Sequence, residues 1–145
     1  MKPYRKFKKF QIRWKEKMGD DPNDPYLYRW TFIFANYSIR IHHWIRSDDD
    51  RCFHDHSWDF VSYIIRGNYI NVTPKGRFDV KAGQIWKSKA KDRHYLEIPE
   101  KGAWTILFCG KPYHKWDFYV VGKKYRPLQY FYKFKGTACN EQKEK

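Results

Sequence analysis

The sequence predicts an all-β fold, an antiparallel sandwich or barrel. Aromatic residues make up 21% of the 145 residues, and aromatic rings are favoured on sheet surfaces. Short runs of aromatic and β-branched residues recur at even spacing, with glycine, proline and asparagine turns between them. One hydrophobic core suffices at this length, so we expect a single domain over residues 1–145.

The individual strands follow from these runs. LYRWTFIF, residues 27–34, is aromatic and β-branched, and Asn36 allows a turn before YSIRIHHWI, residues 37–45. WDFVSYIIRG is expected to end at Gly67, and NYINVT to pair back across a tight turn there. The remaining strands are expected at residues 77–80, 82–88, 94–98, 103–110 and 116–121, so that the barrel occupies about residues 26–121.

One short helix is predicted ahead of the strands, over residues 3–17. Tyr4, Phe7, Phe10 and Trp14 lie three, three and four residues apart, with lysines between them. This spacing is typical of an amphipathic helix with an aromatic stripe.

The net charge of +14 is concentrated in two basic, aromatic-rich extensions, residues 1–18 and 122–145. Residues 1–17 hold 8 Lys or Arg and 1 acid, and residues 123–145 hold 7 and 2. These extensions are suited to nucleic-acid binding, with cations on phosphates and rings stacked on bases. They fit equally well as solubilising ends whose aromatic residues pack on the barrel.

The sequence also bounds the location of the chain. No apolar run approaches the 18 residues of a membrane span, and the N-terminal stretch lacks the apolar core of a secretory signal. The cysteines Cys52, Cys109 and Cys139 are few, odd in number and far apart, which argues against a disulfide framework. A reducing, cytoplasmic setting is therefore expected.

The stretch RCFHDHSWDF carries the most specific chemical signal. His54 and His56 are two residues apart, so on a strand both side chains point to the same face. This spacing offers two imidazoles to one metal ion. His94 is the natural third ligand and Asp59 a fourth, or else a residue that orients a histidine.

The other histidines are predicted to have packing roles and not to bind the metal. His42 and His43 are adjacent, so they face opposite sides of a strand, and His114 is predicted to lie in a turn.

The same stretch resembles the first cupin motif, G-x5-H-x-H-x3-4-E-x6-G. His54, His56 and Gly67 fall at matching positions, whereas the motif glutamate would lie at Phe60 and the nearest carboxylate is one residue earlier, at Asp59. Residues 83–94 are similar to the second motif, which supplies the last histidine. The resemblance spans about residues 37–120, and HDHSWDF also resembles small uncharacterised cupins of bacteria and their viruses.

The resemblance implies a double-stranded β-helix, or jelly-roll barrel, with a divalent metal ion inside. If Asp59 points outward, three histidines hold the ion, as in cupins that resemble thiol dioxygenases. If Asp59 coordinates, the strand must bulge. Iron is the first candidate, and zinc, manganese and nickel are alternatives.

Four residues are candidates for contact with a substrate. Arg66 and Arg93 are suited to holding a carboxylate or phosphate, although exposed surface arginines are the alternative. Cys52 shares the parity of His54 and His56, but a small apolar filler is the alternative role. Trp58 is either a pocket wall or part of the core.

The function predicted is a small metal-binding cupin enzyme, dioxygenase-like or a lyase or isomerase, acting on a small anionic substrate. One alternative is a cupin that binds a nucleotide or sugar without catalysis. Another is a nucleic-acid-associated protein that uses its basic ends. A 2-oxoglutarate oxygenase is disfavoured, because His56 stands where that family has a carboxylate. Pairing of two copies through their sheets is a further expectation.

Overall fold

The computed structural model describes residues 10–19, 21–47, 52–120 and 123–134. Its strands are β1 (Phe10–Met18), β2 (Leu27–Phe34), β3 (Tyr37–Trp44), β4 (Phe53–His54), β5 (Phe60–Thr73), β6 (Gly76–Lys81), β7 (Ile85–Ser88), β8 (Tyr95–Glu97), β9 (Ala103–Cys109), β10 (Phe118–Val120) and β11 (Lys123–Tyr125). The helix α1 (Pro127–Phe134) follows them. The prediction of a β-rich chain is confirmed.

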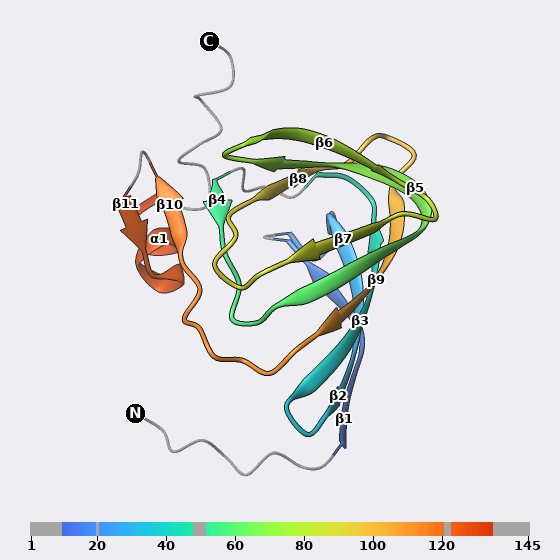
Figure 1. Cartoon of the computed structure of the whole chain (residues 1–145), viewed down its shortest axis with the longest axis horizontal. Helices are drawn as coiled ribbons and strands as arrows, with labels where there is room; N and C mark the ends of the chain where they lie inside the picture. Colours follow the sequence, from blue (N-terminus) through green and yellow to red (C-terminus); the bar gives the residue numbers. More distant parts are fainter. Residues whose placement is uncertain (1–9, 20, 48–51, 121–122, 135–145) are drawn as a thin grey trace.

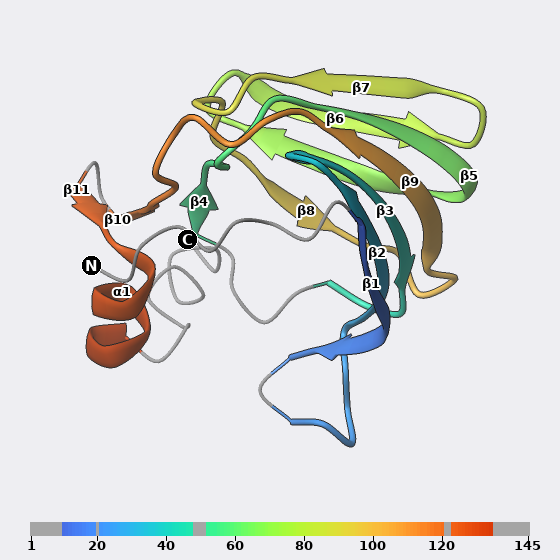
Figure 2. The same cartoon turned by 90° about the horizontal axis from the view of Figure 1, so that it is seen from below.

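Eight of these strands form one antiparallel sheet that curves around an interior (Figures 1 and 2). Their order is β1-β2-β3-β9-β5-β6, and β7 and β8 also pair with β5. A second sheet has the order β11-β10-β4, and α1 lies beside it in both views. The strand β4 therefore links the small sheet to the mouth of the curved one.

The long strand β5 joins the two halves of the curved sheet. Its first half pairs with β7 and β9, and its second half pairs with β6 and β8. The prediction of two strands meeting in a turn at Gly67 is therefore wrong. Gly67 has φ +78° and follows a register shift between Ile64 and Arg66, so the chain bends there without reversing.

Close backbone packing explains why glycine is needed at this bend. A Cβ atom on Gly67 would overlap the carbonyl oxygen of Gly102. Gly102 has φ +70°, and a Cβ atom there would overlap the carbonyl oxygen of Trp44. Three backbone segments therefore lie in contact at this point, and side chains larger than hydrogen are excluded from it.

The predicted helix over residues 3–17 is wrong over its described part, because residues 10–18 form β1. This strand pairs with β2 from Phe10↔Phe34 to Met18↔Leu27, with a register shift at Lys15, whose φ is +46°. The ladder pairs the backbone of β1 with one side of β2. Backbone pairing with a distant strand has outweighed a local spacing that suited a helix. The rest of the predicted helix lies outside the described residues.

Alternation on β3 separates the two adjacent histidines as predicted. His43 faces outward, where its ring stacks on Trp104 at 4.1 Å between centroids, and Trp104 stacks in turn on Trp30 at 5.8 Å. His42 faces inward and is 8% exposed. The outer surface of the sheet therefore carries a row of stacked aromatic rings.

The buried side chains form two clusters. The larger lies between the halves of the curved sheet and comprises Leu27, Trp44, Ile64, Tyr69, Val80, Ile98 and Ala103. The smaller lies beneath the small sheet and comprises Cys52, Phe118, Val120 and Tyr130.

The cysteines differ from the prediction. Cys52 is disulfide-bonded, whereas Cys109 is a free, buried cysteine. The expectation that the cysteines stay unpaired is therefore wrong for Cys52. No helix in the described part of the chain has the length and apolarity that crossing a bilayer requires.

Candidate metal centre

The backbone brings three histidines together at the mouth of the curved sheet. His54 and His94 exchange both backbone hydrogen bonds, each 3.0 Å long, as an antiparallel bridge. The amide of His56 donates to the carbonyl oxygen of Ala90 at 2.9 Å. His54 and His56 keep the same side of the chain, so residues forty positions apart in sequence meet without depending on a flexible loop.

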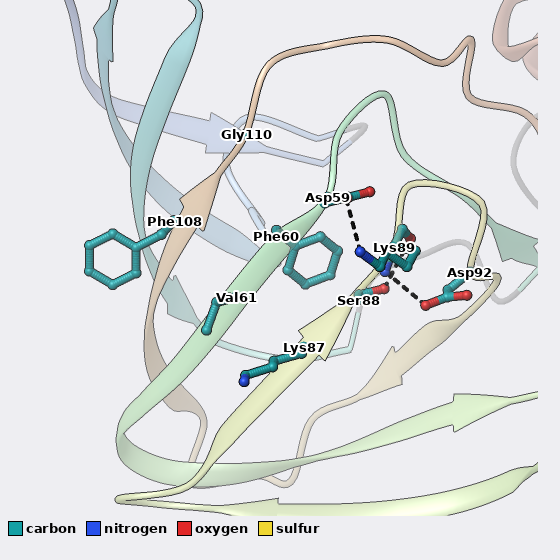
Figure 3. Close-up of a pocket in the computed structure, with 9 residues that line it drawn as sticks. All are labelled: Asp59, Phe60, Val61, Lys87, Ser88, Lys89, Asp92, Phe108 and Gly110. Atoms are coloured by element: carbon teal, nitrogen blue, oxygen red, sulfur yellow. Dashed lines mark hydrogen bonds and ion pairs between the residues drawn. The ribbon is translucent and has the colours of Figure 1, made fainter.

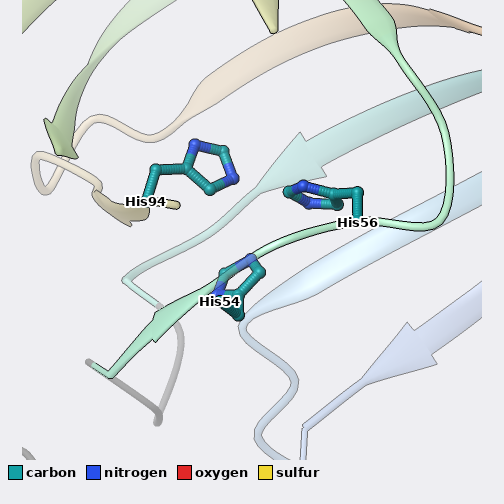
Figure 4. A group of neighbouring side chains, drawn as sticks. All are labelled: His54, His56 and His94. Atoms are coloured by element: carbon teal, nitrogen blue, oxygen red, sulfur yellow. The ribbon is translucent and has the colours of Figure 1, made fainter. Parts of the chain in front are cut away.

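The three rings converge on one point (Figure 4). One nitrogen from each of His54, His56 and His94 lies within 4.8 Å of the others. The ring centroids are 5.1 Å apart for His54–His56 and for His54–His94, and 4.9 Å apart for His56–His94. Three of the four ligands expected from the sequence are thus gathered in a single group that suits a divalent metal ion.

Burial keeps these imidazoles neutral. It lowers the pKa of His54 to about 4. Burial also holds the pKa of His56 well below the ordinary value, and the neighbouring His94 and His54 add to the effect. His94 is shifted in the same direction, again chiefly by burial. Neutral imidazole is the form that binds a metal, so the group needs no deprotonation near pH 7.

A buried amide sets the tautomer of His94. The Nδ1 of His94 lies 2.8 Å from Oδ1 of Asn71, which is fully buried on β5. An amide oxygen only accepts, so Nδ1 carries the proton and donates it, and Nε2 keeps its lone pair. A second hydrogen bond of this kind is how proteins orient a ligating histidine. Asn71 therefore acts as a positioning residue for the group.

Replacing Asn71 by alanine is expected to weaken metal binding by about 10- to 100-fold, because His94 loses the group that fixes its tautomer and orientation. Affinity for Zn²⁺ is measured by competition with a chromophoric chelator. Asn68→Ala is the matched control, since Asn68 lies on the same strand but bonds to Asp79 instead of a histidine. Equal affinity in wild type and Asn71→Ala would remove the positioning role.

Phe60 occupies the position at which the cupin motif has its glutamate. Its side chain is 5% exposed, and its ring centroid lies 5.0 Å from that of His56 and 6.0 Å from that of His94. An apolar ring therefore covers the histidines on this side and offers no ligand atom. The described group consequently has three nitrogen ligands.

Asp59 is not brought into the group. It precedes Phe60 directly, and since Phe60 points inward, Asp59 points outward. Its Oδ1 accepts from the Ala90 amide at 2.8 Å and from the Tyr113 hydroxyl, and its Oδ2 lies 3.5 Å from Nζ of Lys89. The bonds from Tyr113 and Ala90 hold the pKa of Asp59 below its ordinary value. Asp59 thus anchors a loop in this structure.

The outward side of Asp59 borders a shallow pocket with a volume of about 400 Å³ (Figure 3). It lies at the start of β5, beside the ends of β7 and β9, and is separate from the three histidines. Its lining consists of Asp59, Phe60, Val61, Lys87, Ser88, Lys89, Asp92, Phe108 and Gly110. None of the predicted substrate-binding residues contributes to it.

The four predicted substrate-binding residues are scattered. Arg66 is exposed on β5 opposite Trp104, and the guanidinium of Arg93 lies 4.0 Å from the ring centroid of Tyr119. Cys52 is buried in the smaller core cluster.

Trp58 differs from the other three, because the guanidinium of Arg40 lies 4.3 Å from its ring centroid. Arg40 belongs to the inward face of β3, so Trp58 has a link to the interior that the others lack.

Sequence reasoning missed the buried carboxylate of Asp55, which lies between the two histidines and is 1% exposed. It accepts from the amide of Asp117 at 2.7 Å, from the hydroxyl of Tyr119 at 2.9 Å and from Nε2 of His114 at 2.9 Å. Strand alternation could have predicted this position. If His54 and His56 face the interior, Asp55 between them points to the opposite side, toward Tyr119 of the small sheet.

The inward position of His42 has a consequence for pH dependence. Burial lowers its pKa to about 3, with Arg29 and Arg40 contributing. The ordinary value in the unfolded chain is about 6.5. Neutral His42 therefore leaves the folded state at full stability above about pH 6.5. The folded state loses stability as the pH falls toward 3, because the unfolded chain takes up the proton first. From neutral pH to about pH 5, His42 alone is expected to cost about 2 kcal/mol of unfolding free energy.

Urea denaturation of metal-free protein across this pH range measures the effect. His42→Gln should flatten the pH dependence by about that amount, whereas His43→Gln should leave most of it in place because His43 lies on the outer face. Identical slopes for wild type and His42→Gln would contradict the prediction.

Comparison with known proteins defines the fold but not the chemistry. The sequence matches no family model and no curated protein. Among solved structures, an RmlC-like cupin from Shewanella frigidimarina superposes with a TM-score of 0.55 at 13% identity, covering 74% of this chain and 97% of that one. An uncharacterised Klebsiella pneumoniae protein with a double-stranded β-helix domain gives 0.55 at 14%, covering 68% and 88%.

Larger proteins also match over part of their length. HppE in its Fe(II) form gives a TM-score of 0.54 at 10% identity, covering 70% of this chain and 56% of that one. AerE from Microcystis aeruginosa gives 0.53 at 10%, covering 68% and 46%. This chain thus spans about half the length of these two proteins. Identities this low support a shared fold alone. The chain has the double-stranded β-helix fold of the cupin superfamily.

Proposed function

We propose that this protein is a metal-dependent enzyme in which His54, His56 and His94 hold a divalent ion beside a small anionic substrate. The observation that carries the proposal is the convergence of three neutral imidazoles, one buried and two half-buried. Burying three such groups together is costly unless they gain a shared partner. The Asn71 bond to His94 adds the second layer of contacts found around metal ligands.

The side chains around the group suit this role. Three neutral ligands leave the ion its full charge, so when bound it would polarise an anionic substrate or activate a small molecule such as dioxygen. Phe60 shields the histidines on one side and limits the access of water. The reaction class that fits is a dioxygenase-like oxidation, or a lyase or isomerase reaction.

Iron is the first candidate for the ion. Imidazole ligands suit iron, zinc, manganese and nickel to different degrees. The same fold holds Fe(II) in HppE, which supports iron. Zinc or manganese would favour isomerisation, hydrolysis or a structural role.

Elemental analysis of the untagged protein tests the proposal, both as purified and after anaerobic reconstitution with Fe(II), Zn²⁺, Mn²⁺ or Ni²⁺. About one ion per chain is expected. Iron would direct the search for substrates toward oxygen-consuming reactions, which an oxygen electrode follows. Failure to bind any of the four ions in a stoichiometric amount would overturn the proposal.

A non-enzymatic ligand-binding protein is the second candidate. It is favoured by buried polar atoms in the interior that have no partner among the described residues, among them Oγ1 of Thr31 and Oγ1 of Thr105. The two functions differ in their dependence on the ion. Ligand affinity that survives complete chelation would support the binding protein, and loss of affinity on chelation would support the enzyme.

A further inference from the structure

A group of polar side chains lines the interior on the side of β2, β3 and β9. Arg40 and His42 are two residues apart on β3, so they share a face. Thr31 of β2 lies opposite Arg40, and Thr105 of β9 lies opposite His42. Directly opposed residues in a sheet have Cβ atoms about 5 Å apart. These four residues, the inner polar patch, therefore form one continuous surface.

The patch lies near the candidate metal centre. The guanidinium of Arg40 stacks on Trp58, which is two residues along the chain from His56. A molecule bound to the patch would therefore lie beside the histidine group.

Three polar atoms of the patch lack hydrogen-bond partners. Thr31 and Thr105 are each 1% exposed and His42 is 8% exposed. Oγ1 of each threonine and Nε2 of His42 have no partner within the described part of the chain. Buried polar side chains in folded proteins nearly always have a partner, because an unmet hydrogen bond is costly. Three unmet atoms on one surface indicate that something binds there.

The charge of Arg40 is also uncompensated. Its guanidinium stacks on Trp58, and its Nε donates to Oγ of Ser38 at 3.5 Å, but within the described residues it pairs with no carboxylate. The Cys109 thiol interacts with it, yet burial raises the pKa of that thiol, so it stays neutral. A partly buried cation without a counterion attracts an anion.

A neighbouring arginine does not add to this charge. Arg29 lies close enough to lower the pKa of Arg40. However, its Nε donates to Oε2 of Glu16 at 3.2 Å, so its charge is already paired. Arg13, which lies opposite Thr31 in the ladder, also lowers the pKa of Arg40. The surface around Arg40 is therefore positively charged and suited to an anion.

We infer that the inner polar patch binds the carboxylate of a small organic acid, with Arg40 as its counterion and Thr31, Thr105 and His42 as hydrogen-bonding partners. A carboxylate accepts about four hydrogen bonds, and the planar guanidinium can supply two of them. Ordered water would satisfy the hydroxyl groups but would leave the charge of Arg40 unbalanced.

The inference rests on the proposed function, because it places the acid beside the ion held by the three histidines. It assigns the substrate contact to Arg40 and gives no such role to the exposed Arg66. It also explains the position of Trp58, whose ring holds the guanidinium in place.

Ligand-detected NMR titration of the full chain tests the inference, with acetate, propanoate and 2-hydroxypropanoate as probes and inorganic phosphate as comparison. Each titration is run on metal-free and on Zn²⁺-loaded protein, and the zinc content of every sample is measured. Arg40→Gln is expected to weaken binding of the tightest acid by about tenfold or more. Thr31→Val, which keeps the shape, should weaken it by a smaller factor.

Two further variants serve as a control and as a substitute for Arg40→Gln. Arg66→Gln removes an arginine from the outer surface and should leave acid binding unchanged. If Arg40→Gln does not fold, as judged by circular dichroism, Arg40→Lys retains a charge but loses the planar fork and should still bind more weakly.

The inference is overturned if no acid binds wild type, if Arg40→Gln and Arg40→Lys both match wild type, or if phosphate binds more tightly than every acid. Failure of the metal proposal is recognised separately, as acid binding that depends on Arg40 in protein that takes up no ion.

Discussion

Replacing His54 and His56 together by alanine is expected to reduce metal content from about one ion per chain to near zero. The double variant leaves His94 as the one remaining imidazole of the group, and a single imidazole holds a divalent ion weakly. Removing two imidazoles from this point costs little in folding, because the backbone bonds that position them remain. Plasma emission spectroscopy on dialysed samples provides the measurement.

The matched control is His43→Ala. His43 is a histidine of the same sheet, but it stacks on Trp104 on the outer surface. The His43→Ala variant should retain the full metal content. A double variant that still binds one ion per chain would place the metal elsewhere in the molecule and would remove the basis of the proposed enzyme.

Gly67→Ala is expected to cause a large loss of stability. The added Cβ overlaps the carbonyl oxygen of Gly102, which is backbone and cannot rotate away. Gly67 also has φ +78°, which costs a non-glycine residue about 1 kcal/mol. Together with overpacking of about 1–3 kcal/mol, the total is about 3 kcal/mol. Urea denaturation monitored by tryptophan fluorescence measures this loss of unfolding free energy.

Gly83→Ala separates the two causes. Gly83 has a similar φ of +86°, but nothing lies within 4 Å of a Cβ atom placed there. It should therefore lose only about 1 kcal/mol, from the backbone conformation alone. Equal losses at Gly67 and Gly83 would show that contact with Gly102 contributes nothing.

The strands were predictable where their signal is local. The alternation and turn residues of LYRWTFIF and YSIRIHHWI depend on neighbours in sequence, and β2 and β3 form where these runs predict. The N-terminal segment carries a helical spacing of aromatic residues, but the residues that decide its structure are those of β2. The segment also alternates at Phe10, Ile12 and Trp14, which is a strand signal, so its sequence alone was compatible with both structures.

The same distinction applies to the site. The His-x-His spacing has a direct geometric meaning on a strand, so two candidate ligands could be recognised from it, and the second cupin motif agreed with His94 as the third. Asn71 and Arg40 come from other strands and meet the histidines only through sheet register. Arg66 and Arg93 were chosen for their charge, which says nothing about the direction in which a side chain points.

Asp55 ties the metal centre to the C-terminal part of the fold. The segment that presents His54 and His56 to the interior is bonded on its other side to residues 114–119, which lead into β10, through three hydrogen bonds to the Asp55 carboxylate. If a bound ion orders this segment, it also stabilises β10 and β11 against local opening, because the same hydrogen bonds hold both. By reciprocity, loosening that hairpin lowers the affinity for the ion. The hairpin supplies no ligand, yet thermodynamically it belongs to the binding site.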